Sequence, residues 1–207
     1  MKRKIGTSLM LCGAALILLA LSFFGFNQWE AQQAEQSVED ILLQLLKEIP
    51  DETNAAEILR QPMGTPVEYL DPSAFEMTEV EIDGYAYIGY LSIPSLELKL
   101  PIMSSWGYPQ LKIAPCRYFG SVRSKDLVLL AHNYKKHFGR LKELQEGGAV
   151  LFTDMDGVTY EYTMVAKDIL PPAAVEEVTA GEYDLTLFTC TPGGASRVTV
   201  YCDLKKN

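Results

Sequence analysis

A cysteine and an arginine near the end of the chain stand on either side of a short loop. Residues 184–190 have the pattern of a strand that ends on Cys190, residues 191–196 are rich in Pro and Gly, and residues 197–202 form a second strand pattern that opens on Arg197. Because side chains alternate along a strand, pairing across this loop places Cys190 and Arg197 side by side on one face. A guanidinium beside a thiol favours the nucleophilic thiolate. The pattern therefore predicts a nucleophilic cysteine at the strand ends that flank this loop.

The other cysteines fit structural positions better. Cys12 lies in an apolar run, and Cys202 is in the middle of a strand pattern with the phase of a core residue. Cys116 lies in an irregular segment with no histidine near it in sequence, and it stays an alternative nucleophile. We expect Cys116 and Cys202 to be buried free thiols, although a disulfide between them stays open.

Two histidines are available as a general acid or base. His132 directly follows an apolar segment, residues 126–131, which has the pattern of a buried strand, and such a strand would hold the ring rigidly. His137 follows two lysines in a polar stretch, which is typical of a solvated loop. The sequence favours His132 and keeps His137 as the alternative.

Charge and composition argue against several classes of protein. The 207 residues have a formal net charge of −9, and no basic patch offsets the 27 acidic residues, which argues against a nucleic-acid-binding protein. The cysteines form no C-x-x-C pair, and the two histidines offer few ligands at zinc spacing. Asp154, Asp156 and Gly157 superficially resemble a calcium loop, but the spacing fails and the required glutamate is absent, so they predict a turn. We expect no metal and no cofactor.

The N-terminus predicts a membrane anchor. A basic tail, residues 1–4, precedes an apolar run, residues 5–26, which is long enough as a helix to span a hydrocarbon core of about 30 Å. A cleaved signal peptide normally has a shorter apolar region and an A-x-A site, whereas this run is followed by Trp29, which suits a membrane interface. An uncleaved single-pass anchor is favoured. The positive-inside rule then keeps the basic tail in the cytoplasm and exports the rest of the chain.

Residues 27–80 are predicted to form a helical stalk and a linker. A one-sided apolar stripe consists of Val38, Ile41, Leu42, Leu45, Leu46 and Ile49, and Pro50 ends it. Residues 51–60 predict a second short helix, and residues 61–80 carry Pro, Gly and acidic residues without periodicity, as in a linker. The striped helix is expected to act as a stalk or to lie over the domain that follows it.

Residues 81–207 have a mainly β pattern. Short strand-like segments occur at residues 88–94, 96–102, 126–131, 150–153, 158–162, 185–190 and 197–202, and residues 164–169 either continue the strand before them or add another. The segment between residues 106 and 120 is irregular, with one helical turn expected near residues 110–114. Many short strands, few helices and frequent turn signals predict a closed or nearly closed β-barrel.

The combination of these features resembles the sortases, which are membrane-anchored cysteine transpeptidases of mainly Gram-positive bacteria. The resemblance rests on Leu187-Phe188-Thr189-Cys190, on Arg197 in the following strand and on His132 after an apolar strand. It covers roughly residues 85 to 204, and the strand pair within residues 87–102 looks like the opening of the sortase barrel. The L-x-T-C motif alone is weak, but its occurrence with the His, the Arg, the barrel pattern and the anchor is specific.

The resemblance implies roles for the matching residues. Cys190 would attack the Thr–Gly carbonyl of an LPXTG-like sorting signal and form a thioacyl-enzyme. His132 would protonate the departing amine and later take a proton from the incoming amine, while Arg197 would bind the substrate backbone and the oxyanion. The acceptor would be an amine of a peptidoglycan precursor or of a pilin. The implied substrate contacts are Thr189, Ala131 and Asn133.

The sequence also departs from the family pattern. Ala131 stands where the family commonly has glycine before the histidine, and the segment before Cys190, residues 171–183, is brief for a substrate-contacting insertion. The N-terminal anchor favours a class B-like member, or another class anchored at this end, over the pilin-polymerising class with a C-terminal anchor.

Two other functions stay open. A membrane-anchored cysteine endopeptidase fits the order of His132 and Cys190, although the Q-A-C-x-G signature of caspases is missing. The second open function is that of a non-catalytic, membrane-tethered β-barrel in which the cysteine is merely buried.

Overall fold

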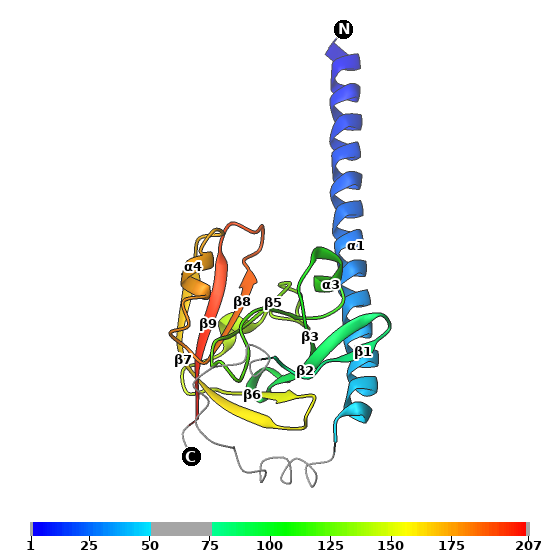
Figure 1. Ribbon diagram of the computed structural model, residues 1–207. Helices are drawn as coiled ribbons and strands as arrows, with labels where there is room; N and C mark the ends of the chain where they lie inside the picture. Colours follow the sequence, from blue (N-terminus) through cyan, green and yellow to red (C-terminus); the bar gives the residue numbers. More distant parts are fainter. Residues whose placement is uncertain (1, 51–75, 206–207) are drawn as a thin grey trace, which may run out of the picture.

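Within the described part of the chain, the secondary structure consists of nine strands, a long N-terminal helix and four short helical turns (Figure 1). The computed structural model describes residues 2–50 and 76–205. The helix α1 spans Lys2–Glu48, and the short turns are η2 (Pro94–Leu96), α3 (Tyr108–Leu111), η3 (Leu141–Glu143) and α4 (Val175–Val178). The strands are β1 (Val80–Ile82), β2 (Tyr85–Ile93), β3 (Leu98–Met103), β4 (Cys116–Phe119), β5 (Leu127–Ala131), β6 (Ala149–Asp154), β7 (Thr159–Leu170), β8 (Leu185–Cys190) and β9 (Arg197–Leu204).

The strands close into a barrel. Their order is β1-β2-β3-β4-β5-β8-β9-β7-β6. A further pairing of β2 with β6 closes eight of these strands, β2 to β9, into a ring. The short strand β1 lies outside the ring and pairs with the first part of β2. Gly89 lies at the closing seam with φ of 141°, and a Cβ there would collide with the carbonyl oxygen of Thr153 on β6. Glycine therefore permits the close approach that completes the ring. The prediction of a mainly β, closed barrel is confirmed.

Alternation along β5, β8 and β9 gives these strands two different faces. The inward face is apolar and belongs to the main core of the barrel; it presents Leu127, Leu129, Ala131, Leu185, Leu187, Val200 and Cys202. The outward face packs Val128 and Phe188 against Val178 of α4, with Tyr118 beside them. Because both faces are covered, the ends of these strands are held rigidly.

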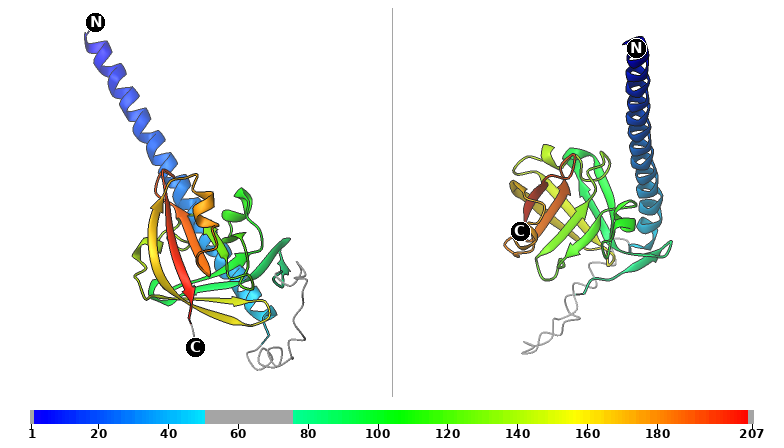
Figure 2. Two further views of the ribbon diagram at one scale, coloured as in Figure 1. Left: turned by 60° about the vertical axis from the view of Figure 1, so that its left-hand side comes forward. Right: turned by 90° about the horizontal axis from the view of Figure 1, so that it is seen from above.

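The helix α1 stands beside the barrel and is a single continuous element (Figure 2). By length and composition it is apolar enough to cross a membrane. Its C-terminal part packs on the barrel near β1 and β3, and the predicted stripe is confirmed for Val38, Ile41 and Leu45, which are buried. Leu46 is 38% exposed and lies off this contact. The predicted second helix, residues 51–60, and most of the predicted linker lie outside the described residues.

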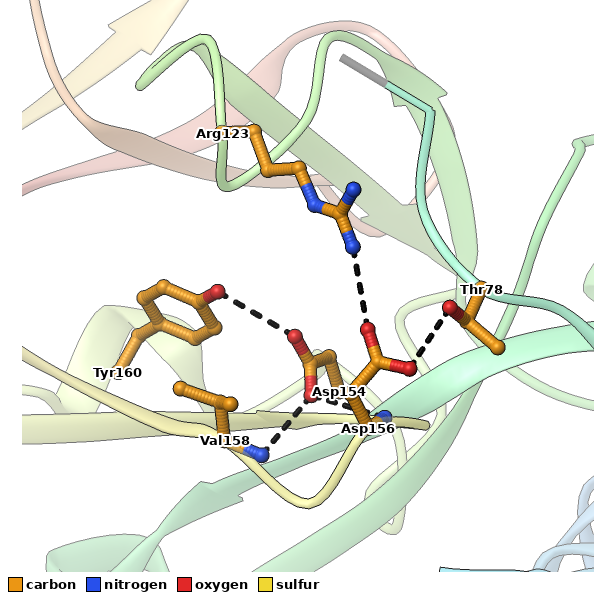
Figure 3. A network of polar contacts seen from close by, with 6 residues as sticks. All are labelled: Thr78, Arg123, Asp154, Asp156, Val158 and Tyr160. Carbon is orange, nitrogen blue, oxygen red and sulfur yellow. Dashed lines mark hydrogen bonds and ion pairs between the residues drawn. The ribbon is translucent and has the colours of Figure 1, made fainter. Parts of the chain in front are cut away.

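The β6–β7 hairpin turns at the two aspartates that superficially resembled a calcium loop (Figure 3). The Asp154 carboxylate accepts hydrogen bonds from the backbone N–H groups of Asp156 and Val158, at 3.0 and 2.9 Å. The Asp156 carboxylate pairs with Arg123 at 3.1 Å and accepts the Thr78 hydroxyl at 2.8 Å. The Asp154 carboxylate therefore stabilises the turn, as the turn interpretation predicted, and the Asp156 carboxylate connects the turn to neighbouring segments.

Candidate active site

The β8–β9 hairpin brings Cys190 and Arg197 together. They are directly paired in the antiparallel register of the two strands, as the sequence pattern predicted. In the connecting loop the N–H of Thr191 donates to the carbonyl of Ser196 at 2.9 Å. Nη1 of Arg197 donates to the carbonyls of Gly194 and Ser196, at 3.3 and 3.2 Å. The guanidinium thus holds the loop, and Arg197 and Cys190 both line one pocket.

His132 is brought to the same place by the parallel pairing of β5 with β8. Ala131, the last residue of β5, is in register with Thr189, so His132 follows β5 at the level at which Cys190 ends β8. The Thr189 hydroxyl donates to the Ala131 carbonyl at 2.8 Å. This buried hydrogen bond joins the residue before the histidine to the residue before the cysteine, and it fixes the spacing of the two strand ends.

A pocket opens where these strands end. Its wall includes Cys190, His132, Arg197, Thr189 and Ala131, so the structure brings together five of the six predicted site residues. Asn133, the sixth, is half-buried and lies outside the residues that line the pocket.

The rest of the pocket wall is largely apolar and aromatic. The Trp106 and Tyr118 rings lie 5.6 Å apart, and Tyr118 meets Phe188 edge-on at 5.3 Å. Pro172, Ala174 and the α4 residues Val175 and Val178 also line the pocket. The pocket therefore combines a few polar groups at the strand ends with a mainly apolar wall. This arrangement is typical of ligand-binding sites.

Burial and two nearby charges act on His132. Burial lowers its pKa from the ordinary value of a histidine; the nearby Glu30 carboxylate raises this pKa, and Lys112 lowers it further. Glu30 on α1 and Lys112 beside α3 form an ion pair at 2.5 Å. The histidine is therefore electrostatically connected to the helix α1, which the sequence did not predict.

His137 does not lie in a solvated loop, so that prediction is wrong. The chain turns back after His132, with the N–H of His137 donating to the Tyr134 carbonyl at 3.0 Å. The side chain is fully buried, and neither ring nitrogen has a hydrogen-bond partner among residues 2–50 and 76–205. The turn exposes the two preceding lysines and directs His137 inward, where burial lowers its pKa to about 4.

His137 packs behind the pocket rather than in it. Its ring lies 5.4 Å from the Tyr134 ring, which in turn lies 5.0 Å from His132. The only sequence signal for this inward position is that aromatic residues, Tyr134 and Phe138, flank His137 within the polar stretch.

The remaining cysteines lie away from the pocket. Cys202 is fully buried in the barrel core, as predicted, and Cys116 is fully buried in a second cluster beside α1. Burial raises the pKa of each thiol to about 12. Both are free, and Cys12 lies exposed on α1. Among the described residues, Cys190 is the one cysteine that lines the pocket.

Comparison with known proteins gives a consistent result. A family model described as the sortase domain matches residues 91–205, which is more than half of the chain. The chain is 29% identical over 136 residues to sortase A of Streptococcus agalactiae serotype III (strain NEM316), in an alignment that covers 58% of this chain and 53% of that protein. It therefore spans about half the length of this curated relative.

Solved structures of similar fold are also sortases. Sortase C of Streptococcus pneumoniae superimposes with a TM-score of 0.55 at 18% identity, covering 83% of this chain and 97% of that one. Sortase A of Corynebacterium diphtheriae gives a TM-score of 0.53 at 21% identity, covering 59% and 62%. These likenesses show the barrel fold, and the family match covers the strands that carry Cys190, His132 and Arg197. This chain belongs to the sortase family.

Proposed function

We propose that this chain is a membrane-anchored cysteine transpeptidase that cleaves an LPXTG-like sorting signal and transfers the exported protein to an amine. The observation that carries the proposal is the convergence of Cys190, His132 and Arg197 on one pocket at the ends of three neighbouring strands. A nucleophile, a proton donor and a fixed positive charge are the groups that acyl transfer needs.

In the first half of the reaction, the Cys190 thiolate attacks the carbonyl carbon between Thr and Gly of the signal. The carbonyl oxygen becomes an oxyanion, which the Arg197 guanidinium stabilises from its position beside the thiol. As the C–N bond breaks, protonated His132 donates a proton to the departing glycine amine. The product is a thioester between Cys190 and the threonine, with neutral His132.

In the second half, the acceptor amine attacks the thioester carbonyl. His132 takes the proton that this amine loses as the new amide bond forms. The C–S bond then breaks and returns Cys190 as a thiolate. No net proton or electron is gained or lost over the cycle, so neither half of the reaction requires an oxidant or a reductant.

The apolar part of the pocket wall favours a signal that carries Leu and Pro on the N-terminal side of the scissile Thr–Gly bond. Trp106, Tyr118 and Phe188 offer aromatic surface in the pocket, and aliphatic side chains make up much of the rest of its wall. Thr189 and Ala131 lie in the pocket wall. The Thr189 hydroxyl already donates a hydrogen bond to the Ala131 carbonyl, which occupies its proton. We assign Thr189 a positioning role in addition to any contact with substrate, and Asn133 stays a predicted substrate contact.

The proposed location is the cell membrane, with the N-terminus in the cytoplasm and the barrel outside. The apolar part of the helix and the basic residues at its N-terminal start support this orientation. The expected partners are exported proteins with LPXTG-like tails and an acceptor amine from a peptidoglycan precursor or a pilin, with no role for nucleic acid.

The test is incubation of the purified protein with a fluorescent LPXTG-like peptide, with and without an amine acceptor such as triglycine. We expect an amine-dependent ligation product that carries the acceptor. Cleavage at an unchanged rate and without ligation would instead support the endopeptidase function. Arg197→Lys is an informative variant, because it keeps the charge but loses the planar fork, and we expect it to lose activity.

A further inference from the structure

The helix α1 connects the apolar N-terminal run to the barrel without a break. Its side chains are exposed from Met10 to Trp29, and then Ala34, Val38, Ile41 and Leu45 are buried. Because both parts belong to one helix, the barrel has a fixed height and orientation relative to the end of the apolar run. A flexible stalk would not impose such a restriction.

The pocket lies close to the point at which α1 leaves the apolar run. Glu30 is four residues beyond Phe26, which is about 6 Å along a helix axis. Its ion pair with Lys112 holds α3 at this level, and the α3 residues Tyr108 and Leu111 line the pocket. Figure 1 shows α4 and the β8–β9 loop at the same end of the barrel, the end toward which the N-terminal half of α1 extends.

This end of the barrel exposes large apolar side chains. We define the rim as Trp106, Tyr108 and Val175, which line the pocket and are 45%, 76% and 49% exposed. Trp and Tyr are the residues that prefer the interface between lipid and water, because each combines an apolar ring with a polar group. Glu176 and Glu177 on α4 are exposed beside the rim, so contact at the level of the headgroups is favoured over deeper insertion.

We propose that the rim rests on the surface of the bilayer that α1 crosses, so that the pocket opens at the level of the lipid headgroups. The partner is therefore the phospholipid surface itself. The pocket then receives peptide segments that lie at the membrane surface. This inference rests on the proposed membrane anchoring, but not on the chemistry proposed for Cys190.

The two tryptophans of the chain, Trp29 and Trp106, allow a direct test. The full chain is reconstituted in phosphatidylcholine liposomes with and without bromine-labelled acyl chains, which quench nearby tryptophan. Trp29→Phe leaves Trp106 as the reporter, and Trp106→Phe leaves Trp29. The matched control adds Leu43→Trp to the variant without either tryptophan, because Leu43 is 63% exposed on α1. That site lies about 25 Å along the helix beyond Phe26.

We expect Trp106 to lose at least about half the fraction of fluorescence that Trp29 loses, and the Leu43→Trp reporter to lose almost none. If Trp29 is quenched while Trp106 behaves like the Leu43→Trp reporter, the rim does not touch the membrane and the inference is overturned, although the anchor stands. If Trp29 is not quenched, the anchor and the inference are both overturned. Ligation of a soluble peptide tests the proposed transpeptidase independently of either result.

Discussion

The pocket and the buried interior of the protein contain the same two kinds of reactive residue. Cys190 and His132 line the pocket, while Cys202 and His137 are fully buried away from its wall. Cys190 and Cys202 even belong to neighbouring paired strands, but they lie on opposite faces of them. Burial raises the pKa of Cys202 to about 12 and lowers that of His137 to about 4, so both interior groups are held neutral at pH 7.

The difference shows that residue type alone does not decide chemistry in this barrel. Strand phase decides which thiol reaches the pocket, because a shift of one residue along β8 or β9 moves a side chain from one face to the other. For the histidines, the deciding element is the turn after β5, which leaves His132 at the strand end and directs His137 inward.

The largest expected effect separates the two cysteines. Cys190→Ala removes the nucleophile, and we expect peptide ligation to fall by at least about 10⁴-fold with little change in the melting temperature. Cys202→Ala leaves a small cavity in the core, so it should cost about 1 kcal/mol of unfolding free energy and retain most of the activity. Ligation assays and thermal unfolding of both variants measure this contrast. Comparable activity loss from Cys202→Ala would show that the two faces are not functionally distinct.

The histidines should differ in the same way. His132→Ala removes the proton donor and acceptor, so we expect ligation to fall by about 10²–10⁴-fold. His137→Phe keeps a buried aromatic ring against Tyr134 and should retain most of the activity. The kcat of each variant with the same peptide and amine makes the comparison. A larger loss from His137→Phe would assign the proton-transfer role to the buried histidine instead.

Much of this contrast was predictable from the sequence because it depends on strand periodicity. The phase of residues 184–202 placed Cys190 opposite Arg197 and put Cys202 in the core, and the register of β8 with β9 confirms both. The apolar segment before His132 predicted β5 for a similar reason, since a strand covered on both faces is apolar throughout. Local patterns of this kind are set by neighbours a few residues apart.

Features that depend on distant contacts were not predictable. The strand β4 falls in a segment that was expected to be irregular, because it is four residues long and is defined by pairing with β5. His137 has polar neighbours in sequence, and only the path of the turn shows that it is buried. The ion pair between Glu30 and Lys112 joins residues far apart in the chain, so no local pattern indicates that α1 lies beside the pocket.

Thiol labelling sharpens the comparison without requiring a substrate. In a Cys12→Ala background, we expect a charged methanethiosulfonate to modify Cys190 at least about 10³-fold faster than Cys202 or Cys116, because a core thiol reacts only when its strand opens. Mass spectrometry of digested samples over time gives the three rates. Equal rates for Cys190 and Cys202 would support the non-catalytic barrel.

The smallest expected effect concerns stability at acid pH. The folded-state pKa of His137, about 4, is below the ordinary value of 6.5, so between these two values the unfolded chain binds more protons than the folded chain. The stability that depends on neutral His137 is therefore fully present above pH 6.5 and is lost as the pH falls toward 4. The loss should be on the order of 3 kcal/mol, measured by urea unfolding at a series of pH values.

His137→Phe should remove most of this dependence, because a phenyl ring cannot be protonated. It also removes two buried ring nitrogens that have no partner among the described residues, so stability at pH 7 should be equal or slightly higher. His132→Phe is the matched control: its imidazole is only half-buried, and the decrease in stability at acid pH should largely persist. An unchanged acid dependence in His137→Phe, together with a large loss of stability at pH 7, would mean that the buried imidazole is bonded in the folded protein. In that case the interior histidine would be a polar structural element, and the contrast with His132 would rest on geometry rather than on desolvation.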